Sequence, residues 1–539
     1  MIDDATSDLV SRRNFLRGAA GLAGMASLGA LFGCASDEPS AVALAATGDD
    51  AAPGGSTAAT PKCVFLFIGD GMSYPQIQAT AYFNGAQRGG EEPTIERVSF
   101  MDFPVIGSQY TYDSTSFCPD SASTATSIAS GRKTASGVIN VSPDASERFE
   151  TIAEKLKRQL GYKVGVLTSV NLNHATPAAF YAHQQSRKNY YEIGQELIAS
   201  GFDYFAGGGL LNPTGASDNR IDLYEAAREA GYEVACTYDE AARVTAGTKA
   251  LLVAEKLADE DALSYAMDAT ADEWSLCDYV AKGIEVLVDG DAGFFMICES
   301  GKIDWACHAN DCAAAIHDVM ALEDCVAEAV AFYEDHPDET LIVVTGNHET
   351  GGLTIGYAET NYDTFLANIA QQKISYAKFD SDYVAGYIEA GTTYEQAMED
   401  VAQLFGLERP TAASSASTGA VVLDAVAGAQ ETEAEPGSLM LTAYEDGQLR
   451  EAYDRTVAVG AGDQEDMTQE EYVHYGTYEP FTVTLTHLLN RKSGVDFSTY
   501  AHSGLTVPVF AMGAGAEVFD GFYDNTEIYA KLAALTGVV

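Results

Sequence analysis

Apolar runs of strand length that end abruptly in polar residues constrain the fold of this chain most strongly. Residues 62–68 (KCVFLFI) run into Asp70, and residues 293–298 (GFFMIC) run into Glu299. A third run, TLIVV at 340–344, opens directly onto the sequence TGNHETGG. Strands that are apolar throughout are typical of parallel sheets covered by helices on both faces. Because ligands bind at the carboxyl ends of the strands in such sheets, we expect these polar residues to build an active site.

Segments with helical spacing alternate with the apolar runs. Residues 150–159, 274–288 and 313–332 have the spacing of helices, and the runs at 164–170 and 251–254 predict further strands. This alternation predicts an α/β fold with a large, mainly parallel central sheet flanked by helices.

The C-terminal third departs from this pattern. Residues from about 353 to 480 are rich in tyrosine and acidic side chains, and residues 411–438 are of low complexity. We interpret this span as an insertion over the active-site edge of a domain that covers residues 62–539. A strand at 507–512 and a helix near 525–536 are expected to complete the domain.

The N-terminus has the pattern of a targeting segment. Residues 11–16 (SRRNFL) match a twin-arginine signal, and the apolar run at 19–33 is too short for a good membrane span. The run ends in LFGC, which resembles a bacterial lipobox with Cys34 as the acylated residue. A plain signal peptide with a chance cysteine is the alternative. We expect a signal at 1–33, a tether at 34–61, and an exported protein at the cell surface or in the periplasm, anchored by lipid at Cys34.

Composition narrows the classes of partner. The 539 residues include 79 acidic and 30 basic side chains, which give a formal net charge of −49. Such a surface repels nucleic acid, so no nucleic-acid binding is expected, and an anionic substrate must be attracted by local positive charge. The eight cysteines other than Cys34 show no CxxC spacing, which argues against a zinc knuckle.

Five short segments carry side chains suited to chemistry with metal ions. They are GDGMS at 69–73, PDSASTAT at 119–126, NHATP at 173–177 with Arg187 soon after, ESGKIDWACHAN at 299–310, and NH at 347–348 with the late AHSG at 501–504. Singly, each has an ordinary interpretation, such as a helix cap or a packing residue. Together they supply oxygen ligands, imidazoles, a serine and an arginine, which a two-metal phosphoryl-transfer site needs.

Two of these segments indicate specific geometry. Asp304 and His308 are four residues apart, so on a helix they share a face and can chelate one ion. Ser121 falls at a predicted helix N-terminus, where backbone N–H groups point at an anion.

In order and spacing, the segments resemble the alkaline phosphatases of bacteria and animals, over roughly residues 62–352 and 480–539. The resemblance implies a sheet-centred α/β fold, a homodimer, and hydrolysis of small phosphate monoesters with two zinc ions and one magnesium ion. By the same resemblance, Ser121 is the nucleophile that becomes phosphorylated, Arg187 binds the phosphate, and Asp120 orients Arg187.

The metal ligands are also carried over from this resemblance. Those of the first zinc are Asp304, His308 and His502. Those of the second are Asp70, Asn347 and His348, and those of the magnesium are Asp70, Thr176 and Glu299. His174, expected near the magnesium, and Trp305 stand at positions where metal preference and phosphate retention are tuned.

Asn347 is the main departure from the pattern, because the family normally has aspartate there. An amide oxygen can bind zinc but carries no charge, so we expect a weaker second zinc site. Two alternatives stay open, and Asn347 supports only the second of them. One is a related hydrolase of phosphodiesters or sulfate esters, and the other is a non-catalytic phosphate-binding lipoprotein whose second metal site has decayed.

Overall fold

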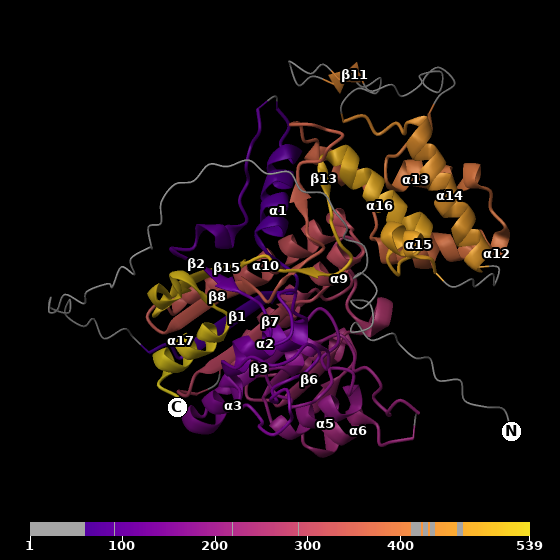
Figure 1. Ribbon diagram of the computed structural model, residues 1–539. Helices are drawn as coiled ribbons and strands as arrows, with labels where there is room; N and C mark the ends of the chain where they lie inside the picture. Colours follow the sequence, from indigo (N-terminus) through magenta and orange to yellow (C-terminus); the bar gives the residue numbers. More distant parts are fainter. Residues whose placement is uncertain are drawn as a thin grey trace, which may run out of the picture. The chain divides into compact units, whose positions relative to one another are not determined.

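A computed structural model describes residues 60–90, 92–217, 219–288, 290–410, 437–460 and 467–539, together with the short strands at 422–423 and 430–431 (Figure 1). The predicted signal at 1–33, Cys34 and nearly all of the predicted tether lie outside these residues. None of the helices in the described residues is both long and apolar enough to span a membrane.

A ten-stranded sheet forms the centre of the fold, in the order β16-β2-β15-β8-β1-β7-β3-β4-β6-β5. Its middle strands are β8 (Thr340–Gly346), β1 (Cys63–Gly69), β7 (Phe294–Ser300) and β3 (Lys163–Thr168), which all run parallel. The predicted strand at 507–512 is β15 (Val507–Gly513), and it runs antiparallel to both of its neighbours. The predicted α/β fold with a mainly parallel sheet is confirmed.

The remaining strands are shorter or lie toward the edges of the sheet. They are β2 (Val105–Tyr110), β4 (Tyr204–Gly207), β5 (Glu233–Ala235), β6 (Ala250–Val253) and β16 (Gly521–Asp524). Only β6 was expected from the sequence, as the run at 251–254.

Helices cover both faces of the sheet, as Figure 1 shows. Alternate residues of β1 face opposite sides, because strand side chains alternate. Val64, Leu66 and Ile68 pack in a cluster with α2 (Ser121–Ser130) and α17 (Thr526–Thr536). Phe65 and Phe67 face the other side of the sheet. There they pack in a cluster with α8 (Leu276–Leu287) and α10 (Cys312–Asp335). The central strands are therefore buried on both faces, which explains why they are apolar throughout.

Several element boundaries differ from the sequence-based expectation, including those of one helix and of one strand at the site. The predicted helix at 150–159 consists of α3 (Ile152–Lys155) followed by a π-helical turn at Leu156–Leu160. The strand predicted at 293–298 continues to Ser300, so Glu299 lies within β7 rather than after it. Its backbone is consequently fixed by strand pairing on both sides, with Ile68 of β1 and Thr168 of β3 as its partners.

The span predicted to be an insertion is mainly helical. It includes α11 (Tyr376–Phe379), α12 (Ala385–Ala390), α13 (Tyr394–Leu404), α14 (Ala443–Gly460) and α15 (Gln469–Tyr475), and α16 (Pro480–Ser493) follows. These helices are coloured orange to yellow in Figure 1, and all of them except α15 contribute to a core that includes Val401, Leu449 and Phe481. From α16, His487 Nε2 lies 3.0 Å from Asn310 Oδ1, which joins this region to the segment just after His308.

Candidate active site

The central strands deliver polar side chains to one edge of the sheet. Asp70 follows β1 directly, and Asn347 and His348 follow β8, the neighbouring parallel strand. All three side chains are buried. Gly71 permits this crowding, because its φ of +70° suits glycine and a Cβ there would lie 2.7 Å from Thr350 Oγ1.

Ser121 is the first residue of α2, and its hydroxyl faces this group. Ser121 Oγ lies 3.1 Å from His348 Nε2 and 3.4 Å from Asp70 Oδ1. All ten residues of α2 are buried, and they are small apart from Ile128, so the helix packs closely against the sheet. The hydroxyl therefore sits at a buried helix N-terminus, a position that favours an anion.

Asp120 is the N-cap of α2 and contacts Arg187. Its Oδ1 accepts hydrogen bonds from the backbone N–H and the hydroxyl of Ser123, at 3.1 and 2.8 Å. Its Oδ2 accepts from Arg187 Nη1 at 3.1 Å. Burial alone would raise the pKa of Asp120, but the charge of Arg187 and these hydrogen bonds outweigh it and lower the pKa. Asp120 is thus an ionised anchor for the guanidinium.

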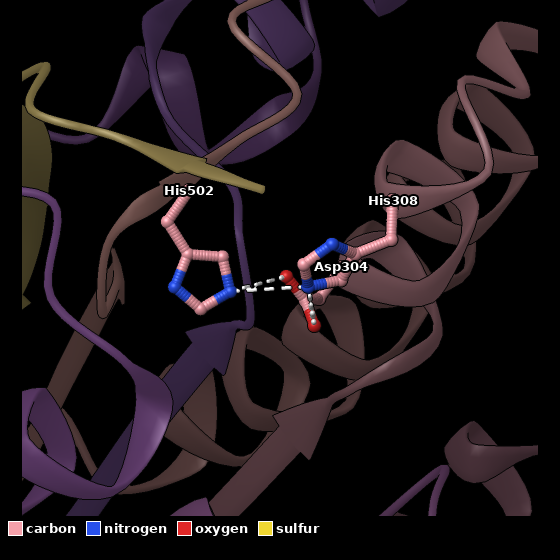
Figure 2. Close-up of side chains that lie close together, drawn as sticks. All are labelled: Asp304, His308 and His502. Carbon is pink, nitrogen blue, oxygen red and sulfur yellow. Dashed lines mark hydrogen bonds and ion pairs between the residues drawn. The ribbon is translucent and has the colours of Figure 1, made fainter. Parts of the chain in front are cut away.

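Asp304, His308 and His502 form a first cluster of ligand atoms (Figure 2). The two histidine Nε2 atoms lie 3.1 Å apart, and they lie 3.4 Å (His308) and 3.6 Å (His502) from oxygens of Asp304. Asp304 and His308 come from α9 (Lys302–His308), as the helical spacing predicted. His502 arrives on β14 (His502–Ser503), which pairs with β9 (Glu349–Thr350).

The other ring nitrogens of these histidines show which way the rings face. His308 Nδ1 lies 2.6 Å from the carbonyl oxygen of Tyr500, and His502 Nδ1 lies 2.5 Å from that of Pro119. A carbonyl oxygen only accepts, so each Nδ1 carries a proton, and Nε2 is the ring nitrogen that faces Asp304 and is left to bind a metal ion. This is the arrangement of histidines that bind a metal ion.

A second cluster joins Asp70, Asp304 and His348, whose ligand atoms lie within 4.8 Å of one another. His348 Nε2 is 3.2 Å from Asp70 Oδ1. Thr350 Oγ1 donates to Asp304 Oδ1 at 2.5 Å. Burial opposes ionisation of Asp304, but His308 and the other histidines outweigh it and hold the pKa of Asp304 well below its usual range. Asp304 therefore contributes to both clusters as a charged group.

Glu299 and Thr176 extend the group on the other side of Asp70. Thr176 Oγ1 donates to Asp70 Oδ2 at 3.3 Å, and Thr168 Oγ1 donates to Glu299 Oε2 at 2.5 Å. Glu299 Oε1 is buried and has no hydrogen-bond partner within the described part of the chain. Burial and the charge of Asp70 raise the pKa of Glu299 well above its usual value. An unpartnered carboxylate oxygen beside a second carboxylate fits a hard divalent cation, which prefers oxygen ligands.

His174 and Trp305 lie at the rim of the same group. Their rings are 6.0 Å apart in an edge-to-face arrangement, and His174 Nε2 lies 3.3 Å from Arg187 Nη2. Burial and the nearby Arg187 lower the pKa of His174 to about 4. A neutral imidazole can accept from the guanidinium, so His174 supports Arg187 at Nη2 while Asp120 holds Nη1.

The structure thus places the predicted catalytic residues and metal ligands, with His174 and Trp305, in one group, while the predicted lipidation residue Cys34 lies outside the described residues. Asn347 also lies in the group, but its amide oxygen accepts hydrogen bonds from backbone N–H groups instead of pointing at the cluster. Sequence reasoning missed the residues that hold this group in place. They are Thr168, which donates to Glu299, Thr350, which donates to Asp304, Lys302, which pairs with Asp259, and Gln76 and Ser503, which both donate to Glu349.

Lys302 shows what such a supporting residue does. Its side chain is completely buried, and Nζ pairs with Asp259 at 2.6 Å. The same ammonium lies over the rings of Trp305 and Tyr265, at 4.5 and 4.2 Å. It therefore holds α9, which carries Asp304 and His308, against the loop that contains Asp259.

The two clusters of ligand atoms make this edge of the sheet a candidate metal site, and comparison with known proteins supplies the family. The family model described as "Alkaline phosphatase" matches residues 61–538, so the chain belongs to the alkaline phosphatase family. Alkaline phosphatase 3 of Bacillus subtilis is 28% identical over 475 residues, which cover 87% of each chain. The human tissue-nonspecific isozyme is 27% identical over 335 residues, covering 53% of this chain and 63% of the relative.

Solved structures of alkaline phosphatases agree with this family assignment. The crystal structure of a cold-active alkaline phosphatase from a psychrophilic Shewanella sp. matches with a TM-score of 0.68 and 25% identity, covering 88% of this chain and 99% of that one. The alkaline phosphatase of Thermus thermophilus matches in fold with a TM-score of 0.69, at 21% identity and with coverage of 90% and 94%. The chain is therefore an enzyme of this family, with candidate metal sites at the edge of its sheet.

Proposed function

We propose that the chain hydrolyses phosphate monoesters through a phosphoserine formed on Ser121. The position of the Ser121 hydroxyl carries this proposal, because it lies at a buried helix N-terminus within 3.4 Å of both Asp70 and His348. A phosphoryl group bound there meets backbone N–H donors that stabilise its negative charge.

Arg187 supplies the local positive charge that a chain with a net charge of −49 needs to hold an anion. A guanidinium binds two phosphate oxygens at once, which fixes the orientation of the phosphorus relative to Ser121. Asp120 and His174 hold the guanidinium from two sides. The phosphate is therefore oriented before the reaction begins.

The proposed reaction consists of two successive substitutions at phosphorus. Ser121 Oγ forms a bond to phosphorus as the ester P–O bond breaks and the alcohol leaves with a proton. Water then forms a bond to phosphorus as the Oγ–P bond breaks, which releases inorganic phosphate and restores the serine hydroxyl. The sum is one ester and one water converted to one alcohol and one phosphate.

The donor sets suit the ions that the family uses. Two imidazoles and a carboxylate from Asp304, His308 and His502 would hold one zinc, and Asp70 and His348 would hold part of a second zinc site. Asp70, Thr176 and Glu299 would hold magnesium through oxygen alone. When bound, such ions supply positive charge that activates the serine hydroxyl and water and stabilises the leaving alkoxide.

Hydrolysis of three matched esters tests this function. We expect the full chain, supplied with zinc and magnesium, to cleave an aryl phosphate much faster than a bis-aryl phosphodiester or an aryl sulfate. Preference for the diester or the sulfate would favour the related hydrolase. Phosphate binding without cleavage of any ester would favour the non-catalytic lipoprotein.

We also propose that the chain is exported by the twin-arginine route, anchored by lipid at Cys34, and dimeric. The motifs SRRNFL and LFGC support export and anchoring, and the family resemblance supports the dimer. The substrate is then a small phosphate monoester outside the cytoplasm.

A further inference from the structure

Asn347 lies at the carboxyl end of β8, and its amide is engaged on both sides. Oδ1 accepts from the backbone N–H of Gly71 at 3.1 Å and from that of His348 at 2.9 Å. Nδ2 donates to Asp70 Oδ1 at 2.7 Å and lies 3.4 Å from Thr176 Oγ1. The side chain is completely buried.

These contacts determine the orientation of the amide. Turning it over would place the NH2 group against two backbone N–H donors and would leave Asp70 facing an oxygen that only accepts. The two backbone N–H groups and the Asp70 carboxylate would each lose a hydrogen-bond partner, and burial makes such a loss costly. Asn347 therefore presents an NH2 group, and not an oxygen, to Asp70 and the cluster.

Asparagine and aspartate at position 347 differ in the number of side-chain oxygens that can accept a hydrogen bond or bind a cation. A carboxylate can accept from Gly71 and His348 with one oxygen and offer the other to a cation. The amide has a single oxygen, and the two backbone donors occupy it. An NH2 group cannot bind a metal cation, because its nitrogen lone pair is delocalised and its hydrogens carry partial positive charge.

Glu349 does not replace the missing ligand. Its carboxylate accepts from Gln76 Nε2 at 2.8 Å, from the backbone N–H of Gly352 and Leu353 at 3.1 Å each, and from the hydroxyl of Ser503. It is buried, and four donors, of which only Ser503 lies on β14, occupy both of its oxygens.

We propose that Asn347 is not a metal ligand, and that the cation position beside Asp70 and His348 is completed by the phosphoryl group itself, so that cation and phosphate bind there in mutual dependence. Asp70 and His348, together with Asp304 shared from the first cluster, offer three ligand groups, fewer than the four that zinc prefers. A phosphate that is held by Arg187 next to Ser121 brings negatively charged oxygens to the same place. This inference rests on the proposed function, because it assigns the phosphate to that site.

Thermodynamic linkage makes the inference quantitative. Whatever factor phosphate adds to cation affinity, the cation adds to phosphate affinity. An aspartate at position 347 would supply both the missing oxygen and a negative charge, so the dependence on phosphate should largely disappear.

Zinc binding measured with and without phosphate tests the inference. The metal-free full chain is dialysed against zinc-buffered solutions with constant magnesium, in the presence or absence of inorganic phosphate, and bound zinc is counted. We expect wild-type protein to hold one zinc tightly in either case and to gain about one more with phosphate, as an affinity increase of at least about tenfold. Asn347→Asp should bind both zinc ions without phosphate.

A surface charge control separates ligand chemistry from net charge. Asn361→Asp adds the same charge at an exposed position and should bind zinc as the wild type does. Equal binding of two zinc ions by the wild type with and without phosphate would overturn the inference, and this result needs no variant. If the phosphate dependence is found but no phosphate monoester is cleaved at saturating zinc and magnesium, the inference stands and the proposed function fails.

Discussion

Asp120 accepts hydrogen bonds from Ser123 with one carboxylate oxygen and from Arg187 with the other. The residue that caps α2, and so positions Ser121, thus also positions the arginine proposed to bind phosphate. Nucleophile and anion-binding group are held in a fixed relation by a single side chain. Neither can shift without straining the other, which is the kind of pre-organisation that catalysis needs.

Asp120→Asn separates these two tasks. The amide oxygen can still cap α2, but its NH2 group would face Arg187 Nη1, so two donors would meet and the guanidinium would lose its charged partner. We expect KM for an aryl phosphate and the inhibition constant for inorganic phosphate each to rise about tenfold, the equivalent of about 1.4 kcal/mol. Steady-state kinetics measure both.

Asp144→Asn is the matched control for this change. Asp144 also accepts from nearby serines, Ser142 and Ser146, but it lies on the surface away from the site. Asp144→Asn should leave KM and the inhibition constant for phosphate unchanged. Unaltered phosphate inhibition in Asp120→Asn would show that Arg187 does not depend on this contact.

Ser121→Ala tests the covalent intermediate. Without the hydroxyl no phosphoserine can form, so we expect loss of nearly all turnover and of the label that wild-type protein retains when quenched at mildly acidic pH. Ser127→Ala is the control, because Ser127 is buried in the same helix and donates only to the Ser123 carbonyl. Mass spectrometry of the labelled peptide locates the phosphate, and a label on any residue other than Ser121 would contradict the assignment.

The central strands could be predicted from the sequence because burial on both faces leaves a plain apolar run, as in β1, β7 and β8. The strands that escaped prediction lack that signature. β5 has only three residues, and residues of β2 such as Ile106 and Tyr110 are exposed. The antiparallel direction of β15 could not be predicted either, because side-chain alternation is the same in both directions.

The site could be predicted as a set of residues but not as a set of contacts. Strand ends and helical spacing indicated Asp70, His348, Asp304 and His308. The orientation of the Asn347 amide depends on the backbone of Gly71, which is 276 residues away in the sequence. Contacts of this kind arise only when the parallel strands β1 and β8 lie side by side, so local sequence patterns do not contain them.

Export and anchoring can be tested separately. Replacing Arg12 and Arg13 with lysine should leave folded precursor in the cytoplasm, because the twin-arginine route requires the arginine pair and carries folded proteins. Cys34→Ala should move the exported protein from the membrane fraction to the soluble fraction, since no other lipid attachment is proposed. Cell fractionation with immunoblotting measures both. A soluble wild-type protein whose N-terminus lies beyond Cys34 would rule out the anchor.

His183 should make the stability of the fold depend on pH. Its ring lies between two carboxylates, with Nε2 3.5 Å from Glu154 and Nδ1 3.6 Å from Glu196, and its side chain is only 9% exposed. Burial lowers the pKa of His183, as does the nearby Arg148, but the two carboxylates outweigh both and raise it to about 9. The folded state therefore binds the proton more tightly than the unfolded state, in which the pKa of histidine is about 6.5.

The sign of the effect follows from this difference. The stabilisation is fully present below pH about 6.5 and is lost as pH rises through about 9, so His183→Gln should lower the free energy of unfolding by about 1–3 kcal/mol at pH 6 and by much less at pH 10. Thermal melting of both proteins across this range measures the difference. His336→Gln is the control, because His336 pairs with Glu339 at 3.5 Å but is 42% exposed, where ion pairs contribute little. A melting-temperature difference for His183→Gln that stayed constant or grew with pH would contradict the assignment of a protonated His183.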